Sequence, residues 1–92
     1  MSYVRVEFYG IARLHAGTDS VRIEFPEETT VTLSRVVEAL KAQLPAFAER
    51  CVIGDRLTQA LTFNLDGDRF LDHSAVIDVG ATLLILSRDA GG

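Results

Sequence analysis

The sequence has little of what marks a secreted, membrane-spanning or nucleic-acid-binding protein. Its single cysteine, Cys51, has no partner for an internal disulfide, which predicts a reducing, cytoplasmic environment. No apolar run approaches the ~20 residues that cross a bilayer, and residues 1–5 lack the apolar core of a signal peptide. A net charge of −4 disfavours nucleic acid and anionic membranes, which attract basic surfaces. The expected partners are therefore proteins.

Metal ligands and catalytic motifs are equally scarce. His15 and His73 stand in expected loops with no second ligand at metal spacing. Asp66, Asp68 and Asp72 lack the twelve-residue pattern and terminal glutamate of a calcium loop, and turn formation explains them better. No phosphate-binding glycine loop or basic aromatic pattern is present. We expect no metal, no bound cofactor and no catalytic side chain.

Two segments near the N-terminus alternate apolar and polar residues. This period of two predicts half-buried strands over 4–9 and 21–25. The intervening stretch 10–20 contains Gly-Thr-Asp, so the two strands are expected to form a hairpin with a long loop. Ile11 and Leu14 are expected to turn back from this loop into the core.

A helix is expected next, over residues 33–44. Its apolar residues recur once per turn along one stripe: Leu33, Val36, Val37, Leu40 and Leu44. Thr32 is the expected N-cap, and Pro45 ends the helix because the residue before a proline avoids helical geometry. A short second helical turn is expected over 46–51, where Cys51 is interpreted as core packing rather than as an acceptor thiol.

The C-terminal part predicts three more strands, 61–65, 69–71 and 82–87. The Asp66-Gly67 pair predicts the turn between the first two. Residues 72–79 are expected to form an irregular connection from which Val76 and Ile77 point inward. The last strand is apolar on both faces, which is typical of a central strand.

This order of elements predicts an α+β domain over residues 1–87. One main helix would pack across a mixed sheet of about five strands. A hairpin, a helix and then further strands is the order of the β-grasp, or ubiquitin-like, architecture. Residues 88–92 are expected to form a flexible tail.

The tail ends in Gly91-Gly92, directly after the apolar run of the last strand. At roughly 7% glycine, chance places a glycine pair there about once in 200 chains. A terminal diglycine contributes nothing obvious to folding, but it offers slender backbone and a carboxylate to a narrow active site. A frayed end or a cloning scar is the alternative.

The chain resembles the MoaD/ThiS family of small sulfur-carrier proteins over essentially its whole length. Four stretches carry the resemblance, and their order and spacing are more specific than any one alone: 4–9 with Arg13-Leu14 and Gly17-Thr18, Thr30-Val31, 63–67, and Gly80 ahead of Gly91-Gly92. Two positions depart from the pattern. Ser87 and Arg88 stand where molybdopterin-synthase small subunits commonly carry prolines, and Val79 and Ala81 replace an acidic pair.

The resemblance implies a role for Gly92. In the family, a ubiquitin-activating-type enzyme uses ATP to adenylate the terminal glycine, which becomes a thiocarboxylate that passes sulfur to an acceptor enzyme. By this interpretation Gly92 carries the reacting atom and Gly91 gives access. Molybdopterin synthesis is the favoured pathway, with the large subunit of molybdopterin synthase as acceptor.

Other functions remain open. They are carriers for thiamine, cysteine or tRNA thiolation, a protein-conjugating modifier, and a ubiquitin-like binding module with an incidental diglycine. Strand alternation also predicts a docking surface. If Leu83 and Ile85 face the core, Leu84 and Leu86 point outward on the face shared by Tyr9. An exposed apolar patch of this kind marks an interaction site, and Arg88 beside it could pair with an acidic partner group.

Overall fold

The computed structural model describes residues 2–27, 30–67, 69–71 and 74–88. Its sheet begins with β1 (Ser2–Phe8) and β2 (Ser20–Phe25), which pair antiparallel. Three later strands complete the sheet: β5 (Leu61–Leu65), β6 (Arg69–Leu71) and β7 (Thr82–Ser87). The strand order is β2-β1-β7-β5-β6, and β7 runs parallel to β1 and antiparallel to β5. The predicted mixed sheet of five strands, with the last strand at its centre, is therefore confirmed.

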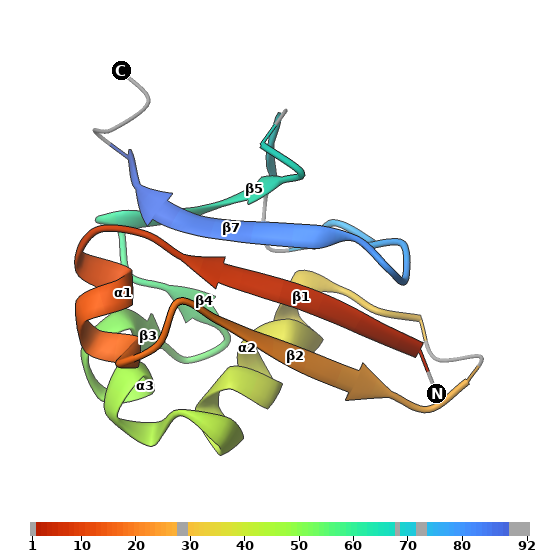
Figure 1. Cartoon of the computed structure of the whole chain (residues 1–92), viewed down its shortest axis with the longest axis horizontal. Coiled ribbons are helices and arrows are strands. Elements are labelled where there is room, and N and C mark those ends of the chain that lie inside the picture. Colours follow the sequence, from red (N-terminus) through yellow and green to blue (C-terminus); the bar gives the residue numbers. More distant parts are fainter. Residues whose placement is uncertain (1, 28–29, 68, 72–73, 89–92) are drawn as a thin grey trace.

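Helix α2 (Leu33–Gln43) packs its predicted apolar stripe on one face of the sheet (Figure 1). Thr32 is its N-cap, because Oγ1 accepts a hydrogen bond from the backbone N–H of Arg35 at 3.3 Å. A second helix, α3 (Pro45–Cys51), follows at once with the proline at its first position. Phe47 of α3 is fully buried and meets the Phe8 ring edge-on, with 5.2 Å between centroids.

The segment between β1 and β2 differs from the prediction. It contains a helix, α1 (Ile11–Ala16), which ends at Gly17 in the left-handed conformation with φ 72°. Ile11 and Leu14 are 53% and 74% exposed, so the expectation that they enter the core is wrong. They lie three residues apart on one face of the helix, and the buried residue is Ala12 instead. Its small side chain lets the helix backbone lie close to its neighbours.

The connection before β7 also differs from the prediction. Ile77 is buried as predicted, but Val76 is 63% exposed. The backbone N–H of Ile77 donates to the carbonyl oxygen of Val31 at 2.8 Å, and Val76 bridges to Thr32. This pairing makes the segment extended, and successive side chains of an extended segment point to opposite sides. Only one of the two can therefore reach the core.

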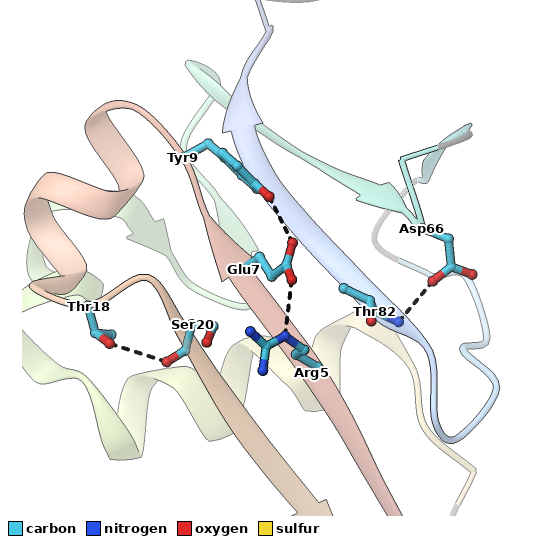
Figure 2. A network of polar contacts seen from close by, with 7 residues as sticks. All are labelled: Arg5, Glu7, Tyr9, Thr18, Ser20, Asp66 and Thr82. Carbon is cyan, nitrogen blue, oxygen red and sulfur yellow. Dashed lines mark hydrogen bonds and ion pairs between the residues drawn. The ribbon is translucent and has the colours of Figure 1, made fainter.

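One small element was not predicted. A hairpin of two-residue strands, β3 (Val52–Ile53) and β4 (Arg56–Leu57), follows α3. Its turn contains Gly54 at φ 64°. The predicted Asp66-Gly67 turn between β5 and β6 is present: Asp66 has a positive φ of 54°, and its Oδ1 accepts from the backbone N–H of Thr82 at 3.0 Å (Figure 2). Asp66 thus helps to hold the turn against the start of β7.

Candidate functional site: the outer sheet face and the root of the tail

The tail begins at the end of the central strand. Gly91 and Gly92 lie outside the described residues, as does the rest of the predicted tail except Arg88. The backbone N–H of Arg88 donates to the carbonyl oxygen of Ala60 at 3.0 Å, which ties this residue to the start of β5. β7 ends at the same end of the sheet as α1 (Figure 1). The predicted tail therefore starts from this end of the domain.

The phase of β7 is as predicted. Leu83 and Ile85 are fully buried under the helices, whereas Leu84 and Leu86 point to the opposite face and are partly exposed. We call that opposite face the outer sheet face. Leu84 lies beside Glu7 of β1 and Asn64 of β5 in the strand register. Neighbouring residues in register share a face, so Leu84 and Leu86 lie on the central strand of the outer sheet face.

The same face carries two polar residues that the sequence analysis did not single out. Thr62 and Asn64 of β5 are only 9% and 6% exposed, although they point away from the helices. Asn64 Oδ1 is buried and has no hydrogen-bond partner among the described residues. The alternation of residues 61–65 could have predicted that Thr62 and Asn64 point to the outer face. Their burial on that face could not be predicted from the sequence of this strand alone.

Tyr9 is 46% exposed and belongs to a short polar network on the outer sheet face. Its hydroxyl donates to Glu7 Oε1 at 2.8 Å, and Arg5 Nε donates to Glu7 Oε2 at 3.0 Å (Figure 2). The Tyr9 hydrogen bond and then the Arg5 contact lower the pKa of Glu7, and the bond to Glu7 raises the pKa of Tyr9. Tyr9 therefore keeps its proton to a higher pH than usual, and Glu7 stays ionised to a lower pH.

A second ion pair lies beside this network. Arg13 Nε is 2.7 Å from Asp19 Oδ1, and these two residues line a hollow of about 210 Å³ together with Arg5, Glu7 and Tyr9. The outer sheet face therefore combines an apolar centre with a charged border at the end of β1. Apolar centres with polar rims are typical of protein–protein contact surfaces.

Cys51 is buried, and burial raises the pKa of its thiol. The packing interpretation fits this placement, because a nucleophilic thiol needs a lowered pKa and access to solvent. No three histidine, cysteine, aspartate or glutamate side chains converge on a metal site within the described ranges. His73, Asp68 and Asp72 lie outside those ranges. Within the same part of the chain, no helix is long and apolar enough to cross a membrane.

Solved structures with the same architecture are numerous enough to define the fold. The small archaeal modifier protein 1 of Haloferax volcanii superposes with a TM-score of 0.76 at 17% identity, over 92% of this chain and 95% of that one. The protein assigned as molybdopterin converting factor, subunit 1, of Pyrococcus furiosus gives 0.71 at 20% identity, over 95% and 98%. A chain of the Amycolatopsis orientalis BexX/CysO complex gives 0.69 at 24% identity, over 97% and 99%.

The fold is the β-grasp. The predicted ubiquitin-like architecture is thereby confirmed. No protein-family model and no curated protein matches the sequence. At identities of 16–24% a shared fold does not fix a shared activity, so function rests on the chemistry of the tail and the surfaces around it.

Proposed function

We propose that the chain is a sulfur carrier whose Gly92 carboxylate is adenylated and converted to a thiocarboxylate. The observation that carries the proposal is the join between the fold and the tail. β7 is the central strand of the β-grasp sheet, and Gly92 lies four residues after Arg88, whose backbone N–H is bonded to Ala60. Four extended residues reach about 13 Å, enough for the carboxylate to leave the surface and enter a partner's active site.

The chemistry asks little of the carrier's own side chains. An α-carboxylate has a pKa near 3.5, so Gly92 is ionised and unreactive at neutral pH. Attack of a carboxylate oxygen on the α-phosphorus of ATP would release pyrophosphate and form an acyl adenylate. Sulfide-level sulfur would then add to the carbonyl carbon and expel AMP. The activating enzyme supplies the ATP site, and the carrier supplies a chain without side chains that fits a narrow channel.

Docking is assigned to the outer sheet face at the tail end. Tyr9, Leu84 and Leu86 would contact the adenylating enzyme and, later, the acceptor enzyme, while Arg88 would meet an acidic group at the channel entrance. Their partial exposure supports this. The likeness to a chain of the BexX/CysO complex supports a carrier that works with partner enzymes rather than as an enzyme itself.

Molybdopterin synthesis is the pathway we propose, with the large subunit of molybdopterin synthase as acceptor. The likeness to the Pyrococcus furiosus converting factor subunit supports it. We place the carrier in the cytoplasm, where its single cysteine would stay reduced.

The alternatives would give different products. The likeness to small archaeal modifier protein 1 favours, as second candidate, a modifier whose Gly92 forms an isopeptide bond with a lysine. Thiamine, cysteine and tRNA-thiolation carriers share the thiocarboxylate and differ in acceptor. A plain binding module would form neither product.

The deciding experiment is intact mass spectrometry after incubation with an adenylating enzyme, ATP and sulfide. A carrier gains the mass difference between sulfur and oxygen, and fragmentation places that gain on Gly92. Deletion of Gly92 abolishes the gain. The enzyme used must thiolate its own cognate carrier and must release pyrophosphate when incubated with this chain. If the mass of this chain stays unchanged under those conditions, the proposal is contradicted.

Matched variants test the docking surface in the same assay. Leu86→Ser on the outer sheet face is expected to slow the mass conversion about tenfold or more, as loss of an apolar interface contact does. Val79→Ser removes a more exposed apolar side chain before the start of β7, away from the tail, and is expected to leave the rate unchanged. Equal rates in both variants would exclude this face as the docking site.

A further inference from the structure

A groove of about 240 Å³ opens at the edge of β5, on the side away from β7. β6 pairs with β5 only from Phe63 onward, so Leu61 and Thr62 lie beyond the end of the edge strand. The apolar lining comes from α2, β4, β5 and β6: Leu33, Val37, Leu57, Leu61, Phe63 and Leu71. The apolar β5 residues of the groove are in the phase opposite to Leu84 and Leu86. Thr62 also lines the groove and pairs with Leu86 in the strand register, so the groove borders the outer sheet face.

The walls of the groove are held in place by hydrogen bonds. Ser34 Oγ donates to Asp55 Oδ2 at 3.2 Å, and Lys41 Nζ donates to the carbonyl oxygen of Gly54 at 3.2 Å. Both bonds tie the β3–β4 hairpin to α2. On the other side, the Arg88–Ala60 backbone hydrogen bond fixes the residue that precedes the tail. A groove with tethered walls is present before any partner binds and needs little reorganisation.

The polar rim is basic, although the whole chain has a net charge of −4. Asp55, Arg56, Arg88 and the neutral Thr62 line it. The Asp55 carboxylate already accepts from Ser34, and Arg56 Nε lies 3.8 Å from its other oxygen. Arg88 forms no ion pair within the described part of the chain. The charge left to attract a ligand is therefore positive, and a guanidinium binds a carboxylate through two parallel hydrogen bonds.

The size of the groove indicates what it holds. Pockets that enclose a drug-sized molecule measure roughly 300–1,000 Å³, so 240 Å³ suits a single apolar side chain. We propose that this groove binds a peptide segment of a partner protein in which an apolar side chain is flanked by carboxylates. The apolar side chain fills the space between β4 and β5, and a flanking carboxylate pairs with Arg88.

The location gives the groove a role in tail recognition. Arg88 both lines the groove and begins the predicted tail, so a segment bound there contacts the chain only four residues before Gly92. That the segment belongs to the enzyme receiving the tail rests on the proposed function. Binding of the segment itself does not, because it involves neither Gly92 nor ATP.

Peptide selection on the whole chain tests the proposal. Short random peptides displayed on phage are selected on the immobilised protein, and the binders are synthesised and titrated against ¹⁵N-labelled chain. We expect a consensus of one leucine- or phenylalanine-sized residue between acidic residues. The amide shifts are expected to concentrate at Leu57, Leu61 and Leu71.

Two arginine variants give the matched comparison. Arg88→Glu is expected to weaken peptide binding about tenfold or more. Arg22→Glu makes the same charge change on the outer face of β2, where Arg22 is exposed, and is expected to leave affinity within about twofold.

Several results would overturn the proposal. They are failure to select any binder, binders without acidic residues, amide shifts confined to the outer sheet face, and equal loss in both arginine variants. If inorganic phosphate alone shifted the groove amides as much as the peptide does, the groove would be a general anion site and not a peptide site. None of these results bears on thiocarboxylate formation, which the mass assay measures separately.

Discussion

The Tyr9 hydroxyl lies 2.8 Å from Glu7 Oε1 and donates to it, so the residue just after β1 is bonded to a residue near the end of that strand. This bond is the largest cause of the lowered pKa of Glu7, ahead of the contact with Arg5. A predicted docking residue therefore also lowers the pKa of its neighbour, and the coupling can be measured.

Replacing Tyr9 by phenylalanine is expected to raise the pKa of Glu7 toward its ordinary value, because the variant lacks the donor hydroxyl. The carboxyl carbon of Glu7 reports this in a pH titration followed by NMR. Tyr3→Phe is the control, since Tyr3 contacts Arg22 through its ring at 3.8 Å and not Glu7. An unchanged Glu7 pKa in Tyr9→Phe would contradict the hydrogen bond.

The same titration has a consequence for stability. A lowered folded-state pKa means that Glu7 stabilises the fold above its unfolded pKa, and that this contribution is lost as the pH falls through the folded value. The free energy of unfolding of wild type and Tyr9→Phe should therefore differ most near neutral pH and converge in acid. Denaturant unfolding at a series of pH values measures this difference.

Two leucine-to-alanine variants test whether Leu14 of α1 is exposed, as the structure shows. Leu40→Ala is expected to lower the free energy of unfolding by about 2–5 kcal/mol, because it opens a cavity at a fully buried position. Leu14→Ala makes the same change on the exposed face of α1 and is expected to alter it by less than about 0.5 kcal/mol. A large loss from Leu14→Ala, measured by urea unfolding, would restore the original expectation that this residue enters the core.

Periodicity was sufficient for the main elements and failed where a helix is short. The stripe from Leu33 to Leu40 and the alternation of Val4, Val6 and Phe8 each repeat often enough to fix type and phase. α1 has six residues, fewer than two full turns, and two apolar residues there look the same whether they face inward or outward. Tertiary packing on the alanine decides between them.

The candidate site divides in the same way. Alternation predicted that Leu84 and Leu86 share one face and lie opposite Leu83 and Ile85, but which pair faces the core was an assumption, because this strand is apolar on both faces. The groove beside Arg88 could not be predicted, because it depends on where β6 stops pairing and on the unpredicted β3–β4 hairpin. Both are matters of register between segments distant in the chain, which a single sequence does not encode in any local pattern.

Asn64 provides a further prediction. Its buried Oδ1 lacks a partner within the described residues, which costs about 1–3 kcal/mol relative to an apolar group of similar shape. Asn64→Leu is therefore expected to leave the free energy of unfolding unchanged or raise it by about 1 kcal/mol. Asn64→Asp places a carboxylate there and is expected to lower it at neutral pH and less so in acid, where the group is protonated. A loss in the leucine variant larger than in the aspartate variant would show that Oδ1 is satisfied.

The parallel pairing of β7 with β1 has a mechanical consequence. β1 runs parallel to β7 on one side and β5 antiparallel on the other, so a pull on the C-terminus against the N-terminus loads the β1–β7 hydrogen bonds side by side rather than one at a time. Two paired strands whose pulled ends lay at the same end of the sheet would instead separate bond by bond under the same force. The domain can therefore withstand a pulling force applied between its two ends, because the hydrogen bonds between β1 and β7 resist that force together.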